Sequence, residues 1–348
     1  MDQLIKTNYM SYKISVCIPS YNRSIFLEPL LDSIRKQTVQ PYEIVVCEDF
    51  SDERDEIEKI LIEFQQRYPD INLKYFLNTV NLGFDKNLKE LISKSSGDYC
   101  FYMGNDDLMN ENAIKRVKEA LDEYGEIGVF SRSYSWFLGA KGNITGVAKH
   151  LPESKLFKSG IDAISFFYRR SAVLSGMVYN RERALEIETD KYDGTLYYQL
   201  YLTGKILEKS DGFYISEVQT YSREGIKPDF GNSEGEKNFT PGMYTHTSRL
   251  HMIKSILNIA KDLNENTLGV YKKIEKDLAY YLFPYIMDQL RLPLKLFIKF
   301  YLDIMKTGLG GYFPAHIHLF LGYILKKKMY LKAVDTIKSL FGRTPYIK

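Results

Sequence analysis

The chain contains the stretch Gly97-Asp-Tyr-Cys-Phe-Tyr-Met-Gly-Asn-Asp-Asp107, in which a short apolar strand ends in a turn that carries two adjacent carboxylates, Asp106 and Asp107. Burying a carboxylate is costly unless it is paired or binds a metal. Mg²⁺ and Mn²⁺ typically bind one or two protein carboxylates together with phosphate oxygens. The stretch therefore predicts a divalent-cation site that holds a diphosphate, in an enzyme that uses a nucleotide ligand.

Strands and helices alternate on the amino-terminal side of this stretch. Apolar runs predict strands at 13–19, 43–47, 72–77 and 98–103, and helical periodicity is found at 25–37, 53–68 and 84–94. Such alternation is typical of an α/β fold with a Rossmann-like, mainly parallel central sheet flanked by helices. Ligands bind beyond the carboxyl ends of the strands in such sheets. We therefore expect one crevice to be formed by the loops 19–23, 48–52, 81–87 and 104–107.

The pattern between residues 111 and 244 is mixed. It predicts a helix at 111–124, strands at 127–131 and 172–179, and a helix at 192–202. The glycine-rich segment 221–246 is expected to be a flexible loop that acts as a lid or stays disordered. We expect residues 1–244 to form a catalytic domain, with a nucleotide-binding half at 1–110 and an acceptor half at 111–244.

Residues 245–348 are predicted to form a basic, amphipathic helical region. They contain 17 Lys and Arg against seven Asp and Glu, whereas residues 1–244 contain 30 against 37. A helix predicted at 289–306 has one narrow charged stripe, so it either packs on the catalytic domain or lies on a membrane surface through residues 289–328. Four glycines and a proline argue against a membrane-spanning helix at 307–325.

Composition narrows the class of protein further. The chain is 45% hydrophobic and 26% charged, which predicts a globular protein, and we expect no nucleic acid among its partners. The apolar runs contain Cys17, Cys47 and Cys100, which predict buried reduced thiols. The first twelve residues have no apolar core of a signal peptide. We therefore expect a cytoplasmic protein that associates peripherally with the inner face of the membrane.

Four segments in this order resemble the motifs of the family-two glycosyltransferases with the GT-A fold. They are Val16-Cys-Ile-Pro-Ser-Tyr-Asn-Arg23, Glu43-Ile-Val-Val-Cys-Glu-Asp-Phe-Ser51, Asn81-Leu-Gly83 and Gly104-Asn-Asp-Asp107. The last segment is similar to the abequosyltransferase-like branch of bacterial surface-polysaccharide enzymes. The resemblance implies inverting transfer of a sugar from a nucleotide-sugar donor, with UDP-sugars favoured, to a saccharide acceptor. The acceptor is expected to be lipid-linked, and the product to be O-antigen or capsule.

The resemblance also implies a set of donor-binding residues. Tyr21 would stack on the base, Arg23 would reach a phosphate, and Asp49 would accept a hydrogen bond from the base. The full donor set is Pro19, Tyr21, Arg23, Glu48, Asp49, Asn81, Lys86, Asn87, Asn105 and Asp106. The alternatives are local: a turn after a strand, a helix cap made by Glu48 or Asp49, and a glycine turn before a surface helix.

The metal ligands and the base follow from the same resemblance. Asp106 and Asp107 would bind Mn²⁺ or Mg²⁺, although Gly104 stands where the family often has an earlier acid. The ion would act as a Lewis acid on the departing diphosphate. Asp193 has the family's spacing to Gly204 and would be the general base. Asp190 is the alternative base, and a helix cap is the alternative role for Asp193.

Two other functions stay open. A sugar nucleotidyltransferase would share the sheet and the cation, but it should carry a glycine-rich loop after the first strand, and residues 19–23 contain no glycine. A catalytically lapsed, membrane-associated scaffold is the non-enzymatic alternative. It is favoured by Gly104 at the first acidic position and by Tyr192 where the family has a glutamate before the base.

Overall fold

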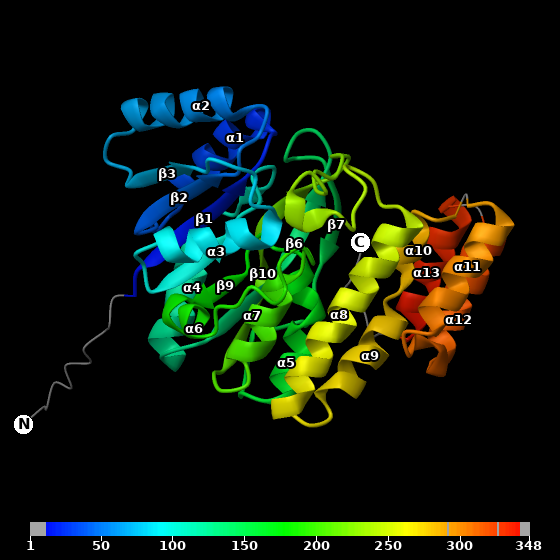
Figure 1. Cartoon of the computed structure of the whole chain (residues 1–348). Helices are drawn as coiled ribbons and strands as arrows, with labels where there is room; N and C mark the ends of the chain where they lie inside the picture. Colours follow the sequence, from blue (N-terminus) through cyan, green and yellow to red (C-terminus); the bar gives the residue numbers. More distant parts are fainter. Residues whose placement is uncertain (1–11, 291, 326, 342–348) are drawn as a thin grey trace, which may run out of the picture.

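The computed structural model describes residues 12–341, apart from 291 and 326, and it has one sheet of ten strands at its centre (Figure 1). The strand order is β3-β2-β1-β4-β9-β6-β10-β5, with β7 beside β6 and β8 beside β10. The strands are β1 Ile14–Ser20, β2 Glu43–Glu48, β3 Leu73–Leu77, β4 Tyr99–Tyr102, β5 Leu108–Met109, β6 Val129–Phe137, β7 Ile144–Ala148, β8 Lys155–Phe157, β9 Val178–Asn180 and β10 Gly212–Arg223. The first four are mutually parallel, as predicted, and β6 and β10 also run parallel.

Helices cover both faces of the sheet, and further helices extend beyond it (Figure 1). The helices are α1 Ser24–Arg35, α2 Arg54–Arg67, α3 Phe84–Lys94, α4 Ala113–Tyr124, α5 Ile161–Phe167, α6 Arg181–Glu186, α7 Tyr198–Ile206, α8 His246–Asn266, α9 Val270–Tyr280, α10 Phe283–Met287, α11 Leu294–Met305, α12 Phe313–Ile324 and α13 Lys327–Phe341. Short 3-10 turns are η1 Arg169–Ala172, η2 Glu234–Glu236 and η3 Leu309–Gly311. The mixed α/β fold and the helical carboxyl-terminal region are therefore as the sequence predicted.

Two apolar clusters meet across the sheet because successive strand residues point to opposite faces. Ile14, Val16 and Ile18 of β1 join the cluster beneath α1, α2 and α4, whereas Cys17 joins the cluster beneath α3 and α7. Strands β2 and β4 divide their residues in the same way. Buried on both faces, these strands read as unbroken apolar runs, which is why the sequence predicted them well.

The structure differs from the prediction between residues 172 and 202. Only Val178–Asn180 of the strand predicted at 172–179 is formed, because Gly176 before it has the left-handed φ of 88°. The helix predicted at 192–202 begins only at Tyr198, since Leu196 has a φ of 64°. In both places a tight turn replaces part of the expected regular element.

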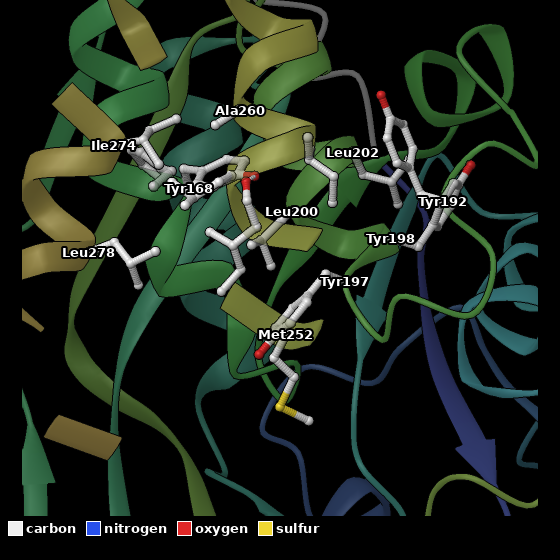
Figure 2. Close-up of a cluster of buried hydrophobic side chains, with 14 of the residues drawn as sticks. Tyr168, Tyr192, Tyr197, Tyr198, Leu200, Leu202, Met252, Ala260, Ile274 and Leu278 are labelled. Carbon is white, nitrogen blue, oxygen red and sulfur yellow. Dashed lines mark hydrogen bonds between the residues drawn. The ribbon is translucent and has the colours of Figure 1, made fainter. Parts of the chain in front are cut away.

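The carboxyl-terminal helices share the larger apolar cluster with the sheet. Figure 2 shows Leu200 and Leu202 of α7 near Ala260 of α8 and Ile274 of α9. The same cluster continues through Phe297 of α11 to Val334 of α13. The helix predicted at 289–306 begins five residues later because Pro293 precedes it. Among the described residues, no helix has the length and hydrophobicity needed to cross a membrane.

Candidate active site

A cleft of about 250 Å³ lies beyond the carboxyl ends of β1, β2 and β4. This is the edge at which a parallel sheet binds its ligands. The loops predicted to form one crevice all contribute to it. We call it the donor cleft, after the nucleotide-sugar donor that the sequence predicts for it. Nine predicted site residues line it: Pro19, Tyr21, Arg23, Asp49, Asn81, Asn87, Asn105, Asp106 and Asp107.

Three predicted site residues lie outside the lining of this cleft. Glu48 is fully buried, and its carboxylate accepts hydrogen bonds from the N–H groups of Phe50 (3.0 Å) and Ser51 (2.8 Å), so it shapes the turn after β2. The carboxylate of Asp193 lies 2.8 Å from the ammonium of Lys89 and 3.9 Å from that of Lys86. Glu48 thus stabilises a turn and caps no helix, because α2 begins at Arg54 without a side-chain cap. Lys86 and Asp193 belong to an ion cluster beside the cleft.

Asp49 holds the turn predicted at 81–83 against the end of β2. Its carboxylate accepts hydrogen bonds of 2.9 Å from the N–H groups of Leu82 and Gly83 and from the amide of Asn78. Burial raises the pKa of Asp49 to about 6 in spite of these bonds. The side chain of Asn87 joins the same cluster by donating to the carbonyl of Cys47 at 3.1 Å.

A strained loop after β1 forms the facing wall. Asn22 and Arg23 have left-handed φ angles of 51° and 63°, which is uncommon for residues other than glycine. The amide of Asn105 donates to the carbonyl of Asn22 at 2.9 Å and so ties this loop to the acidic turn. Strain of this kind persists only where surrounding contacts hold it, and it concentrates at functional sites.

The two aspartates of the acidic turn have different partners. Asp106 forms an ion pair of 2.9 Å with Arg23. Asp107 accepts hydrogen bonds from the hydroxyl of Ser175 (2.5 Å) and the N–H of Arg223 (2.9 Å), but no cation lies within ion-pair distance of it in the described chain. Burial, and then the charge of Asp106, raise the pKa of Asp107. The turn therefore has one carboxylate whose charge is not balanced.

Gly104 lies beside both carboxylates, and there is little room for a side chain at this position. A Cβ atom there would lie 3.1 Å from Oγ of Ser175, 3.3 Å from Oδ1 of Asp106 and 3.6 Å from Oδ2 of Asp107. The described residues contain no cluster of three or more candidate metal ligands. A cation that binds diphosphate needs only one or two protein carboxylates, because phosphate and water oxygens complete its shell. The residues present therefore fit such an ion.

The segment that follows β10 closes the cleft from above. The guanidinium of Arg23 donates to the carbonyl of Lys227 (2.9 Å), and the amide of Asn22 donates to Asp229 (3.0 Å). Glu236 accepts hydrogen bonds from the N–H groups of Phe84 (2.8 Å) and Gly231 (2.7 Å). Sequence reasoning missed Asp229 and Glu236 as cleft residues, since acids in a glycine-rich loop carry no signal of their own.

The long strand β10 was also missed. Arg223 at its end donates to both aspartates of the acidic turn, from its backbone N–H to Asp107 and from its side chain to the carbonyl of Asp106 (3.0 Å). Its run of β-branched and aromatic residues, Phe213 to Tyr221, was a signal that could have predicted it.

Comparisons with known proteins agree with this geometry. The model of the Glycosyl transferase family 2 matches residues 15–182. The abequosyltransferase RfbV of Salmonella typhimurium is 27% identical over 198 residues, which are 54% of this chain and 59% of that protein. A second relative, the GalNAc(5)-diNAcBac-PP-undecaprenol beta-1,3-glucosyltransferase of Campylobacter jejuni, is 29% identical over 32% of this chain and 35% of its own length. The chain thus spans between a third and three fifths of these relatives.

A solved structure resembles the whole described fold. The crystal structure of S. aureus TarS 1-349 in complex with UDP-GlcNAc has a TM-score of 0.60 and 15% sequence identity. The match covers 94% of this chain and 92% of that one. At this level of identity the likeness concerns the fold, and it extends over the carboxyl-terminal helices as well as the sheet.

Proposed function

Because this chain carries a glycosyl transferase family 2 domain on a GT-A fold, as its motifs predicted, we propose that it is an inverting glycosyltransferase. It moves a sugar from a nucleotide-sugar donor, with UDP-sugars favoured, to a saccharide acceptor. The product belongs to a bacterial surface polysaccharide, a proposal supported by the names of the relatives. The observation that carries the proposal is that Asp106 and Asp107 line one cleft together with Tyr21 and Asp49.

Different residues of the donor cleft would bind different parts of the donor. The ring of Tyr21 offers a flat face for the base, and Asp49 offers a carboxylate acceptor beside it. Asp106 and Asp107 would hold Mn²⁺ or Mg²⁺, which supplies positive charge to a diphosphate leaving group. Arg23, already paired with Asp106, adds a second positive group at the same end of the cleft.

We propose Asp193 as the general base that takes the proton from the acceptor hydroxyl. Its side chain is 13% exposed and fixed by Lys89, whereas that of Asp190 is 87% exposed and binds the same lysine from outside. Asp193 also lies at the start of the segment that leads to Leu196 and Tyr197, which border a second cavity next to the donor cleft. An acceptor in that cavity would approach from the side of Asp193.

We propose further that the carboxyl-terminal helices bind an anionic membrane surface, where a lipid-linked acceptor would be found. An apolar groove of about 510 Å³ lies between α11 and α12, and we call it the tail groove. Its lining includes Leu294, Ile298, Phe313 and Phe320, of which Phe313 is 75% exposed and Phe320 64% exposed. Exposed lysines on α11 flank it, which favours an anionic lipid surface over a neutral partner.

The test is release of nucleoside diphosphate from a panel of UDP-, GDP- and TDP-sugars, with Mn²⁺ or with EDTA. We expect one donor to be consumed only when the metal is present. A sugar nucleotidyltransferase would instead release pyrophosphate from a nucleoside triphosphate and a sugar phosphate. If thermal shift detects no nucleotide with or without Mn²⁺, the scaffold alternative is correct, because a ligand of the folded state must raise the melting temperature.

A further inference from the structure

A second cavity, which we call the basic pocket, shares the side chains of Val173 and Phe230 with the donor cleft. Its volume of about 320 Å³ is within the range of small-molecule sites. The remaining walls come from β6, His150, η1, the residues just before α7, helix α8, and Tyr281 with α10. A molecule in this pocket would therefore lie directly beside a molecule in the donor cleft.

Three arginines line the basic pocket, and they differ in their partners. Arg169 is paired with Asp277 at 2.5 Å, and Arg249 is paired with Asp288. Arg170 donates only to the carbonyl of Phe166, its Nε has no partner, and no carboxylate within the described chain lies at ion-pair distance. Burial, and then the charge of Arg169, lower the pKa of Arg170 to about 10, so it is cationic at neutral pH.

A fourth arginine lies behind the pocket wall. Arg132 is 1% exposed and donates to the carbonyl of Val173 (2.8 Å), and its Nε also has no partner. The described residues place no carboxylate at ion-pair distance from it. Burying a charge without a counter-ion is costly. Two such guanidiniums, Arg132 and Arg170, therefore give this side of the chain an unbalanced positive charge.

The other polar groups of the pocket suit a saccharide. His150 is neutral because burial, and then Arg170 and Arg169, hold its pKa well below the usual range, and its Nδ1 has no partner. The guanidinium of Arg169 stacks on one face of the Tyr281 ring, 3.8 Å from its centre, and the rings of Tyr197 and Tyr285 also line the pocket. Aromatic rings with polar tips pack against sugars and still offer a hydrogen bond.

We propose that the basic pocket binds an anionic group carried by the acceptor saccharide, either the carboxylate of an acidic sugar or a phosphate on a sugar. This inference rests on the proposed function, because the pocket is an acceptor site only if the donor cleft binds a nucleotide sugar. Arg170 is the residue that would form the new ion pair. A charge-assisted hydrogen bond at a partly buried guanidinium is stronger than a neutral one.

The experiment is a calorimetric titration of the full chain with three probes: glucuronate, glucose 1-phosphate and glucose. The variant Arg170→Gln removes the charge and keeps most of the volume. Arg181→Gln is the matched control, since Arg181 is also half-buried and also donates to carbonyls, those of Ile92 and Ser93, but away from the pocket. UDP with Mn²⁺ is titrated into each protein as a separate measurement of the donor cleft.

We expect at least one acidic probe to bind and glucose not to bind detectably. Arg170→Gln should weaken the acidic probe by about tenfold or more, and Arg181→Gln should not. The acidic probe that binds more tightly shows whether the anionic group of the acceptor is a carboxylate or a phosphate. The inference is overturned if the acids bind no better than glucose, or if both variants bind them like the unaltered chain. UDP binding without acid binding rejects this inference alone, whereas Arg170-dependent acid binding without UDP binding rejects the proposed function.

Discussion

The donor cleft and the basic pocket share a wall, yet they differ in charge and in how the chain builds them. The donor cleft is formed largely by strand ends, and its buried charged groups are the carboxylates of Asp49, Asp107 and Glu236. The basic pocket is assembled from distant segments, and its unbalanced charge is positive. This difference in charge is the basis of our proposals that the donor cleft receives a cation with a diphosphate and that the basic pocket receives an anion.

The largest effect is expected at Asp193, which precedes the segment of Leu196 and Tyr197 that lines the basic pocket. Asp193→Asn should lower kcat by about 10²–10⁴-fold, the usual contribution of a general base. The measurement is steady-state turnover with the donor identified in the panel. Asp190→Asn is the control, because it removes the other carboxylate that binds Lys89 and should leave kcat within about twofold.

The proposed division between a donor cleft and an acceptor pocket would be wrong if a residue of the donor cleft were the general base. Asp229 lines the cleft and binds only the amide of Asn22 among the contacts described here, apart from a weaker bond to Asn232. A large loss of kcat in Asp229→Asn, with normal turnover in Asp193→Asn, would move the base into the loop after β10. The acceptor would then approach from above the cleft and not from the basic pocket.

A smaller but still large effect is expected at Asp107. Asp107→Asn should lower turnover by about 10²–10³-fold, because the cleft loses charge where it stabilises the leaving group. Its melting temperature should not fall, since burial disfavours the charged carboxylate and the amide oxygen can still accept from the N–H of Arg223. The hydroxyls of Ser175 and Ser222, which donate to the carboxylate, can instead accept from the amide NH₂. Asp70→Asn, at an exposed turn, is the control. Full Mn²⁺-dependent activity in Asp107→Asn would show that this cation is held elsewhere.

The two cavities were unequally predictable from the sequence. The loops of the donor cleft that contain Tyr21, Asp49 and the acidic turn each follow an apolar strand, so the local pattern placed them at one edge. The basic pocket has no such pattern, since Arg170 and Arg249 are 79 positions apart in sequence and meet only through helix packing. The role of Glu48 was ambiguous for a related reason: a carboxylate after a strand suits a ligand and a turn equally well.

Asp85 offers a test of the junction between the two cavities. Its carboxylate accepts hydrogen bonds from the N–H groups of Thr195 (2.8 Å), Leu196 (2.9 Å) and Tyr198 (2.9 Å), and so fixes the start of α7. Asp85→Asn should lower the free energy of unfolding by about 1–3 kcal/mol, because an amide has one acceptor oxygen fewer. Urea denaturation measures this, and Asp55→Asn, exposed in the first turn of α2, is the control.

The same residue predicts a pH dependence with a definite sign. Burial raises the pKa of Asp85 to about 7 in the folded chain, above its value of about 3.9 when unfolded. The folded state therefore binds the proton more tightly, and its contribution to stability is lost as the pH rises from about 4 to 7. Asp85→Asn should have a shallower slope between pH 4 and 7. An unchanged slope would mean that other acids, such as Asp49, account for the dependence.

The smallest effect is expected at the tail groove, which is an exposed surface and not an enclosed cavity like the other two sites. Lys295 and Lys299 lie one helical turn apart on α11 beside Ile298, so a vesicle that covers the groove should also contact them. Each lysine near an anionic surface contributes about 1 kcal/mol, so Lys299→Gln should weaken binding to phosphatidylglycerol vesicles about fivefold in co-sedimentation. Lys59→Gln on α2 is the control.

The alternative is that a second copy of this chain, and not a membrane, covers the tail groove. The dependence of binding on lipid charge distinguishes these two possibilities. Membrane docking requires that zwitterionic vesicles bind more weakly than anionic ones, because the lysines contribute only against negative lipid. A second copy would instead appear as a concentration-dependent dimer without vesicles, and Phe320→Ser would abolish it. In that case the acceptor would be recognised by the positive charge of the basic pocket alone. Membrane binding by the carboxyl-terminal helices would not be needed to bring the acceptor to the pocket.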